Sequence, residues 1–169
     1  AKAAHARDIK VVVDIVPNHS SNLHEWFKAA LAAEPGSPER DRYIFRDGKG
    51  PNGDQPPTNW ENHFGGPAWT RVPDGQWYLH MFTKEQPDWN WNNREVRDDF
   101  LRTLRFWLDH GADGFRVDVA HGLAKDLDRD DLDDYVVWCT NDQPEDGSHP
   151  VIDRDEVHDI YHEWRKVFN

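Results

Sequence analysis

The sequence predicts an α/β fold in which two short parallel strands each end in polar side chains. Residues 9–16 form a β-branched run, typical of a parallel strand covered on both faces. Residues 93–111 place apolar side chains three and four positions apart, as on one buried helix face, and residues 115–118 follow as a second strand. Such a parallel unit is expected to be right-handed, so Asp14 and Asp118 should end neighbouring strands.

The second strand carries a charged pair at its carboxyl end. Arg116 and Asp118 are two residues apart, so strand alternation places both side chains on one side. In α/β barrels this end of a strand holds the reacting groups rigidly while loops shape a pocket around them. We therefore predict that Asp118 is a nucleophilic carboxylate and that Arg116 keeps it ionised. Judged from this stretch alone, a structural salt bridge remains an alternative.

A long segment rich in turn-forming residues separates the first strand from the helix. Residues 20–92 contain many glycines and prolines and one predicted short helix, at residues 23–33. Connections of this length are uncommon in compact domains, which favours a small inserted subdomain or lid. Most of its aromatic side chains are expected to form its own core, and the rest suit the apolar faces of a sugar. These aromatic residues are Trp60, Phe64, Trp69, Trp77, Tyr78, Phe82, Trp89 and Trp91.

Composition narrows the possible partners. A hydrophobic content of 37% with 12% aromatic residues indicates a globular chain. The net charge of −12 opposes binding to nucleic acid or anionic membranes, whereas a neutral oligosaccharide needs no electrostatic steering. Cys139 is the only cysteine, so no internal disulfide is expected and a reducing compartment such as the cytoplasm is compatible. No stretch approaches the roughly 20 apolar residues of a membrane span, and the oligomeric state is left open.

Two segments resemble metal-binding motifs superficially. Residues 126–134 alternate aspartates like a calcium loop, but Asp131 stands where the turn glycine belongs and Val137 where the closing glutamate belongs. A solvated loop is the preferred interpretation. His158 and His162 lie four residues apart on a predicted final helix without an evident third ligand, which favours a surface helix over a zinc site. No metal and no cofactor are therefore predicted.

Three motifs resemble those of the α-amylase family of glycoside hydrolases. They are Asp-Ile-Val-Pro-Asn-His at residues 14–19, Gln-Pro-Asp-Trp-Asn at residues 86–90 and Gly-Phe-Arg-Val-Asp at residues 114–118. The second motif looks like the oligo-1,6-glucosidase and α-glucosidase branch, with Trp89 in place of the usual leucine. The resemblance implies part of a TIM (β/α)8 barrel, from about strand 3 to helix 4. A complete barrel takes about 250 residues, so an incomplete catalytic domain is expected.

The resemblance also implies a division of the chain. Residues 1–19 correspond to barrel strand 3 with the end of its flanking helix. Residues 20–92 correspond to the inserted subdomain, domain B. Residues 93–169 correspond to barrel helix 3, strand 4 and helix 4.

By the same resemblance, the first motif contributes three site residues. Asp14 is expected to brace the site, Asn18 to anchor the loop, and His19 to donate a hydrogen bond to the sugar in the cleavage subsite. A single loop histidine without this context would more often be structural. The motif around it favours substrate binding.

The inserted segment is expected to supply further sugar contacts. Residues 62–66 and 78–82 resemble family segments that deliver phenylalanines to the sugar pocket, so Phe64 and Phe82 are the candidates. Gln86 is the candidate for the outer, leaving-group subsite. Val119, immediately after the predicted nucleophile, resembles enzymes that take α-1,6 linkages and favours that linkage slightly over α-1,4.

A retaining glycosidase uses two carboxyl groups, one as nucleophile and one as acid/base. Asp118 matches the nucleophile, but the family's acid/base glutamate and its later His-Asp motif have no match in this chain. We therefore expect a retaining α-glucosidase for α-linked gluco-oligosaccharides, with this segment inactive by itself. Two alternatives stay open: a related trehalose- or sucrose-forming transglycosylase, and a non-enzymatic amylase-like binding protein.

Overall fold

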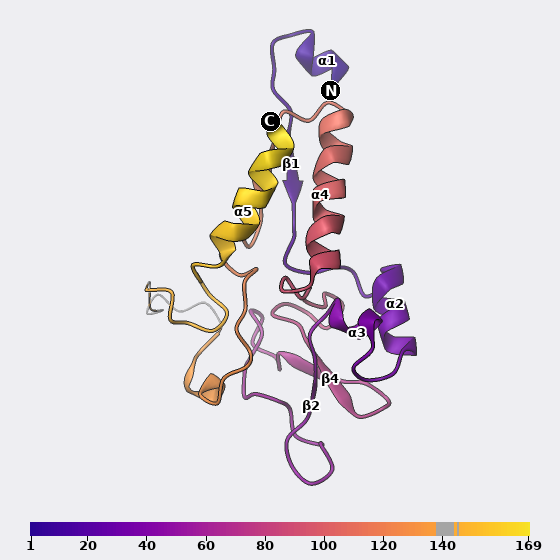
Figure 1. Ribbon diagram of the computed structural model, residues 1–169, viewed down its shortest axis with the longest axis vertical. Helices are drawn as coiled ribbons and strands as arrows, with labels where there is room; N and C mark the ends of the chain where they lie inside the picture. The colour runs from indigo at the N-terminus through magenta and orange to yellow at the C-terminus, as the bar shows by residue number, and fades with distance from the viewer. Residues whose placement is uncertain (138–143, 145) are drawn as a thin grey trace.

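A computed structural model describes residues 1–137, 144 and 146–169 of the chain. Cys139 and part of the polar loop before Pro150 lie outside the described residues. No helix in the described part is long and apolar enough to cross a membrane. Both ends of the chain lie near the same end of the elongated molecule, beside β1 (Val12–Ile15) and the long helix α4 (Arg94–Asp109) (Figure 1).

The expected parallel unit is present. Strand β1 pairs in parallel with β5 (Gly114–Val117), and Asp14 lies opposite Arg116 in the register. Helix α4 precedes β5 in the chain, so β1, the long insert, α4 and β5 form one crossover unit (Figure 1). The prediction that Asp14 and Asp118 end neighbouring strands is confirmed.

Local sequence explains the bounds of α4. The Asn93 side chain accepts a hydrogen bond from the Glu95 backbone N–H at 2.8 Å, as an N-cap should. At the other end Gly111 has a φ of 97°, a left-handed conformation that glycine adopts without strain. Val96 and Leu104 are fully buried, which fixes the face that α4 turns toward the core.

The described residues cover one face of β1. Ile15 is buried in the core and Val13 packs against it. Val12, which alternation directs to the opposite face, is 60% exposed. Within the described chain β1 pairs only with β5, so one face and one edge of the strand remain uncovered.

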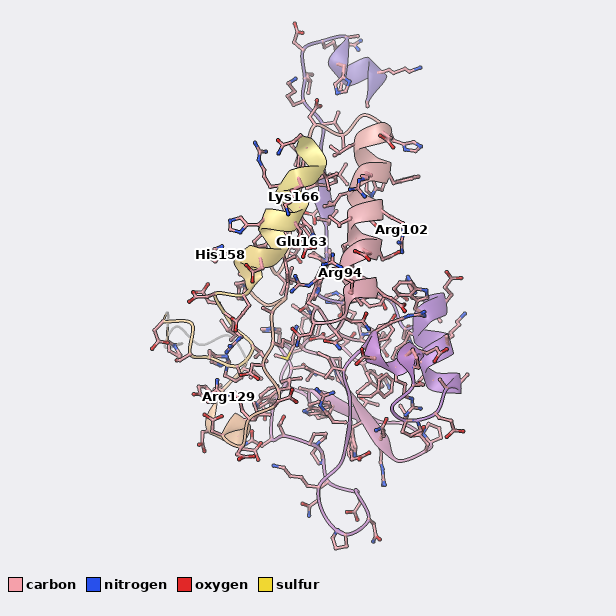
Figure 2. All side chains as sticks on the ribbon, viewed as in Figure 1. Arg94, Arg102, Arg129, His158, Glu163 and Lys166 are labelled. Carbon is pink, nitrogen blue, oxygen red and sulfur yellow. The ribbon has the colours of Figure 1, made fainter. Side chains whose placement is uncertain are left out.

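The predicted final helix is present as α5 (Val157–Arg165), followed by a 3₁₀ turn, η2 (Lys166–Phe168). Its apolar side is buried through Val157, Ile160 and Trp164. Its outer side is tied to α4 by Glu163, whose carboxylate accepts hydrogen bonds from Arg94 at 3.0 and 2.6 Å and from Arg97 at 3.1 Å. Figure 2 shows Arg94 and Glu163 between the two helices.

The inserted segment contains a small sheet that the sequence did not reveal. Its strands are antiparallel in the order β2-β4-β3, and β3 and β4 are joined by a tight turn in which Gly75 has a φ of 101°. Strands of three or four residues are too short to show a period of two. The elements of the insert are α2 (Glu25–Ala32), α3 (Pro38–Asp41), β2 (Phe45–Asp47), β3 (Trp69–Arg71) and β4 (Gln76–Leu79).

Aromatic side chains join the insert to the parallel unit. Trp89 stacks on Tyr43 with ring centroids 4.5 Å apart, and both residues are buried. Trp91 donates its indole N–H to the Pro17 carbonyl at 2.9 Å and meets Trp164 of α5 at 5.8 Å between ring centroids. The expectation that most aromatics of the insert are core residues is confirmed: Trp60 and Trp69 lie in a core of the insert, whereas Tyr78, Trp89 and Trp91 share the core under β1.

The aspartate-rich segment after β5 is exposed or half-buried throughout, as predicted, and one of its carboxylates contacts the insert. It contains a 3₁₀ turn, η1 (Leu132–Asp134). The Asp133 carboxylate accepts hydrogen bonds from Lys49 Nζ at 2.6 Å and from the Asn59 backbone N–H at 2.8 Å. The four-residue helix α1 (Lys2–His5) is held in a comparable way, because His5 contacts the Asp113 carboxylate at 2.7 Å.

Candidate active site

The carboxyl ends of β1 and β5 bring one arginine between two carboxylates. Arg116 Nη1 donates to Asp14 Oδ2 at 2.7 Å and lies 3.0 Å from Asp118 Oδ1. The hydrogen bond to Asp14, followed by the charges of both carboxylates, raises the pKa of Arg116. The predicted contact between Arg116 and Asp118 is confirmed, and the sequence did not show that Asp14 shares the same guanidinium nitrogen.

A tight turn follows the predicted nucleophile. Val119 has a φ of 53°, an unusual backbone conformation for a β-branched residue. A Cβ atom at Gly122 would lie 3.2 Å from Val119 Cγ1 and 3.8 Å from Asn18 Oδ1, so the close approach favours glycine there. The turn leads into the buried residues Leu123 to Lys125.

Lys125 forms a buried polar cluster with Asn18 and Asp88. Its ammonium donates to Asn18 Oδ1 at 3.0 Å and to the Gly122 carbonyl at 2.7 Å, and it lies 3.4 Å from Asp88 Oδ2. Asn18 Nδ2 donates to Asp88 Oδ1 at 3.1 Å, and the Met81 backbone N–H donates to the same oxygen at 3.1 Å. This cluster links the loop after β1, the turn after β5 and the insert.

Burial controls the electrostatics of this cluster. It raises the pKa of Asp88 to about 6 against the attraction of the Lys125 ammonium, and it lowers the pKa of Lys125. Among the described residues no hydrogen bond reaches Asp88 Oδ2, so the ammonium is its compensating group. The sequence analysis missed Lys125; its only signal is a lysine directly after the short apolar run that follows Asp118.

His19 stands at the centre of the predicted substrate contacts. Its Nε2 lies 3.1 Å from Gln86 Nε2, and its ring centroid lies 4.9 Å from that of Phe82. Burial, followed by the positive charge of Lys125, lowers the pKa of His19 to about 4, and the negative charge of Asp118 opposes this shift. His19 is therefore neutral from about pH 5 upward. The backbone holds its loop in place, since Trp89 N donates to the Asn18 carbonyl at 3.0 Å.

Phe82 forms one aromatic wall with its neighbours. The His63 ring lies against it with centroids 4.6 Å apart, and the Phe64 ring lies at 6.2 Å. Phe64 is 69% exposed, and its backbone N–H is fixed by the Asn62 side chain at 2.8 Å. The structure thus brings the two predicted sugar contacts, Phe64 and Phe82, into one wall and adds His63.

A buried histidine, His80, fixes the backbone at Phe82. His80 Nδ1 contacts the Phe82 carbonyl at 2.9 Å, and its Nε2 contacts the Thr70 hydroxyl at 2.7 Å. A carbonyl only accepts, so Nδ1 carries the ring proton and the hydroxyl donates to Nε2. Burial lowers the pKa of His80, which keeps this ring neutral.

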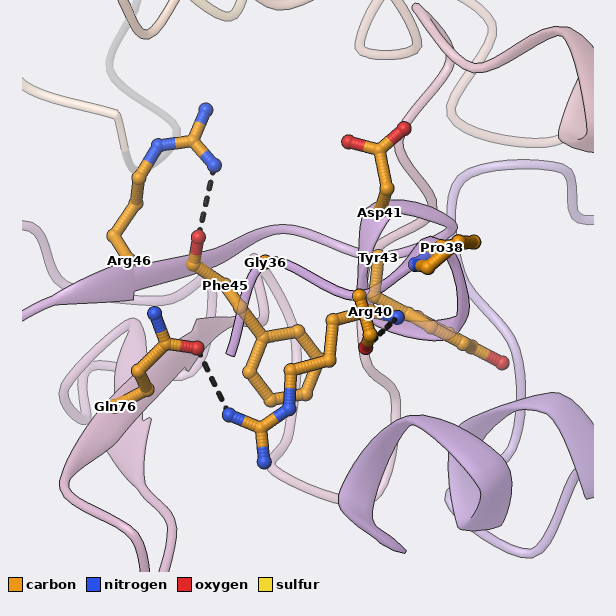
Figure 3. A pocket seen from close by; sticks show the side chains of 9 residues that line it. Gly36, Pro38, Arg40, Asp41, Tyr43, Phe45, Arg46 and Gln76 are labelled. Atoms are coloured by element: carbon orange, nitrogen blue, oxygen red, sulfur yellow. Dashed lines mark hydrogen bonds between the residues drawn. The ribbon is translucent and has the colours of Figure 1, made fainter. Parts of the chain in front are cut away.

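A cleft on the insert lies away from these residues. It has a volume of about 440 Å³ and is lined by Arg40, Tyr43, Phe45 and Gln76 among others (Figure 3). Its buried cation is already fully engaged: Arg40 donates to the Ala30 carbonyl at 2.9 Å and to Gln76 Oε1 at 2.8 Å, and it pairs with Asp74. The Arg40 guanidinium is therefore not available to a ligand. In the described part of the chain no three His, Cys, Asp or Glu side chains are grouped as metal ligands.

Comparison with known proteins decides the family. The model of the α-amylase catalytic domain matches residues 1–169. The chain belongs to this family. Its fold is accordingly part of the TIM barrel of that catalytic domain, and β1, α4 and β5 make up one of the barrel's parallel units.

Similar curated proteins have related names. Over 98% of this chain and 28% of the relative's length, the sequence is 41% identical to trehalose-6-phosphate hydrolase of Bacillus subtilis (strain 168). It is 45% identical to oligo-1,6-glucosidase of Heyndrickxia coagulans over 77% of this chain and 23% of the relative. It is also 45% identical to α-glucosidase of Apis mellifera over 83% of this chain and 24% of the relative. The chain thus spans about a quarter of the length of these relatives.

Solved structures agree with this assignment. Trehalose-6-phosphate hydrolase (TreA) of Bacillus licheniformis superposes with a TM-score of 0.80 at 39% identity, over 98% of this chain and 28% of that one. Isomaltulose synthase (PalI) of Klebsiella sp. LX3 superposes with a TM-score of 0.79 at 34% identity, over the same shares. Relatives of this chain therefore include both hydrolases and sugar synthases by name.

Proposed function

We propose that the whole protein is a retaining glycoside hydrolase of the α-glucosidase type, acting on α-linked gluco-oligosaccharides. The observation that carries this proposal is the ion pair of Arg116 with Asp118 at the carboxyl end of β5, 3.0 Å in length, beside a wall that contains His19 and Phe82. Membership of the α-amylase catalytic-domain family and the names of the relatives support it.

In the proposed reaction Asp118 attacks the anomeric carbon while the bond to the leaving oxygen breaks. An acid/base carboxyl that has no match in this sequence supplies the proton to that oxygen and then takes one from the attacking water. Water releases the glycosyl group from Asp118 with net retention of configuration. Arg116 holds Asp118 in position and favours its ionised form, as a nucleophile requires.

The proposed sugar contacts lie on the loop after β1 and on the insert. His19 and Gln86 are within 3.1 Å of each other and face the sugar with polar groups, and Phe82 and Phe64 supply apolar ring faces. Asp14 braces the site through Arg116, and Asn18 braces it through Lys125. Gln86, which contacts His19, is assigned to the outer leaving-group subsite.

This proposal assigns residues 1–19 and 93–169 to the barrel and residues 20–92 to the inserted subdomain. It also predicts that the 169-residue chain, which contains the nucleophile but no matched acid/base, does not turn over a substrate by itself. Substantial glucosidase activity of the isolated chain, lost in Asp118→Ala, would contradict that prediction.

Covalent trapping tests the proposed nucleophile. The full-length protein is treated with a slowly reacting fluorinated α-glucosyl fluoride, digested and examined by mass spectrometry. We expect one fluoroglucosyl group on the peptide at Asp118, and none in Asp118→Asn. Asp14→Asn is the matched control, because Asp14 contacts the same Arg116 nitrogen but is assigned no covalent role, so labelling of Asp118 should persist. A label on Asp14, or no label in an active protein, overturns the assignment.

A transglycosylase is the second candidate, because trehalulose and isomaltulose synthases are among the structural neighbours. Such an enzyme would share Asp118, Arg116 and His19 and would differ in passing the glycosyl group to a sugar instead of water. Product analysis with sucrose, isomaltose, maltose and trehalose 6-phosphate separates these possibilities. Val119 leads us to expect faster hydrolysis of isomaltose than of maltose, and a strong preference for maltose would contradict this.

A further inference from the structure

We infer that Asn18, oriented by the buried Lys125 ammonium, is a positioning residue that fixes the neutral His19 ring as the Nε2–H tautomer. His19 and Gln86 then present two converging N–H donors to one acceptor oxygen of a ligand. The inferred tautomer does not depend on the proposed function. Only the identification of the ligand oxygen as a sugar oxygen rests on the proposed function.

The first step is the orientation of the Asn18 amide. An ammonium can only donate, so the Asn18 atom that lies 3.0 Å from Lys125 Nζ must be the oxygen. The amide nitrogen is then placed on the opposite side, where it donates to Asp88 Oδ1 at 3.1 Å. Asn18 is 1% exposed, so its amide has neither the space nor the solvent contact to exchange these positions.

The second step concerns the remaining hydrogen of that amide. Asn18 Nδ2 carries two hydrogens, and with one given to Asp88, His19 Nδ1 at 3.2 Å is the acceptor for the other. If Nδ1 carried the ring proton, it would face the second N–H of the buried Asn18 amide, and that amide hydrogen would have no acceptor. Nδ1 is therefore bare, and the single proton of the neutral ring is on Nε2.

The third step is the orientation of Gln86. The Thr83 backbone N–H lies 3.2 Å from Gln86 Oε1, and the Thr83 hydroxyl lies 3.1 Å from the same atom. A backbone N–H only donates, so this end of Gln86 is the oxygen and the end facing His19 is the nitrogen. Gln86 Nε2 and His19 Nε2, 3.1 Å apart, are thus two donors without an acceptor between them.

The unfavourable contact between the N–H groups of His19 and Gln86 lies where a ligand can reach it. His19 and Gln86 are only partly buried, whereas Asn18 and Asp88 are inaccessible. An oxygen that accepts from both N–H groups satisfies them together, and a cationic ligand group is repelled. A doubly protonated ring would also face a donor at each nitrogen, which agrees with the lowered pKa of His19.

The test is the tautomer of His19 in the full-length protein, labelled with ¹³C,¹⁵N-histidine and observed by NMR between pH 6 and 8. The His19 signals are assigned by their loss in His19→Gln. We expect the Nε2–H pattern in the parent protein. In Asn18→Asp a carboxylate replaces the donor at Nδ1, so the ring should move its proton to Nδ1 or take a second proton. Asn52→Asp, at an exposed position, adds the same charge and should leave the pattern unchanged.

An Nδ1–H ring in the parent protein overturns the inference without any variant, even if Asn18→Asp does not fold. A folded Asn18→Asp that keeps the parent pattern also overturns it. Hydrolysis of an α-glucoside is measured on the same samples, and we expect a loss of at least tenfold in Asn18→Asp. An Nε2–H ring in a protein without glycosidase activity would leave the tautomer inference standing and count against the proposed function alone.

Discussion

Replacement of Lys125 by methionine should destabilise the protein strongly. Lys125 and Asp88 are both buried, with side chains 4% and 0% exposed, and the ammonium is the only described group that compensates Asp88 Oδ2. Breaking a buried ion pair from one side typically costs about 3–5 kcal/mol, because the remaining charge has no partner. Methionine keeps an unbranched side chain that is one atom shorter, so loss of packing contributes little.

The loss should depend on pH. Burial already raises the pKa of Asp88 to about 6, above the ordinary carboxyl value of the unfolded chain, so the folded protein binds this proton more tightly. Stability therefore falls as pH rises from about 4 through 6. Without Lys125 the pKa of Asp88 rises further. The decrease in the free energy of unfolding then continues to higher pH. The difference between Lys125→Met and the parent protein should accordingly be larger at pH 8 than at pH 5.5.

Urea unfolding of the full-length protein, followed by tryptophan fluorescence, measures this difference. The exposed Lys28→Met is the matched control and should change stability by no more than about 0.5 kcal/mol. Asp88→Asn removes the charge that Lys125→Met leaves behind, so the double variant should recover a large part of the loss. A loss below about 1 kcal/mol at pH 8, equal at both pH values, would refute the reasoning.

Three further predictions concern the site and the helix contact. Asp118→Ala should lower kcat of the active full-length enzyme at least about a thousandfold with its folding unchanged, measured by α-glucoside hydrolysis and circular dichroism. Arg116→Lys should lower kcat more than it changes KM, because lysine lacks the planar guanidinium whose Nη1 contacts both Asp14 and Asp118; unchanged kinetics would argue against the bridging role. Glu163→Gln should cost about 1 kcal/mol in urea unfolding at pH 7. The hydrogen bond from Arg94 lowers the pKa of Glu163. The stability that Glu163 contributes is therefore present above the ordinary glutamate pKa and is lost as pH falls through the lowered pKa. A cost of Glu163→Gln that does not change with pH would contradict this.

Several features could be predicted from the sequence because they depend on neighbouring residues. Strand alternation is a local rule, and it placed Arg116 and Asp118 on one side, 3.0 Å apart. The bounds of α4 follow from Asn93 at one end and Gly111 at the other. The three motifs indicated the family, which the comparison confirms.

Tertiary structure decided the contacts between distant parts of the chain. Arg116 bridges to Asp14 across the parallel pair, 102 residues away, and no local pattern records that register. Lys125 reaches Asn18 over 107 residues, and its role depends on complete burial, which a single lysine in a sequence does not reveal. Tertiary structure also decides which nitrogen of His19 is protonated, because this follows from the positions of Asn18 and Gln86 around the ring. A sequence names these groups, but only folding brings a donor, an acceptor and a desolvated charge within bonding distance.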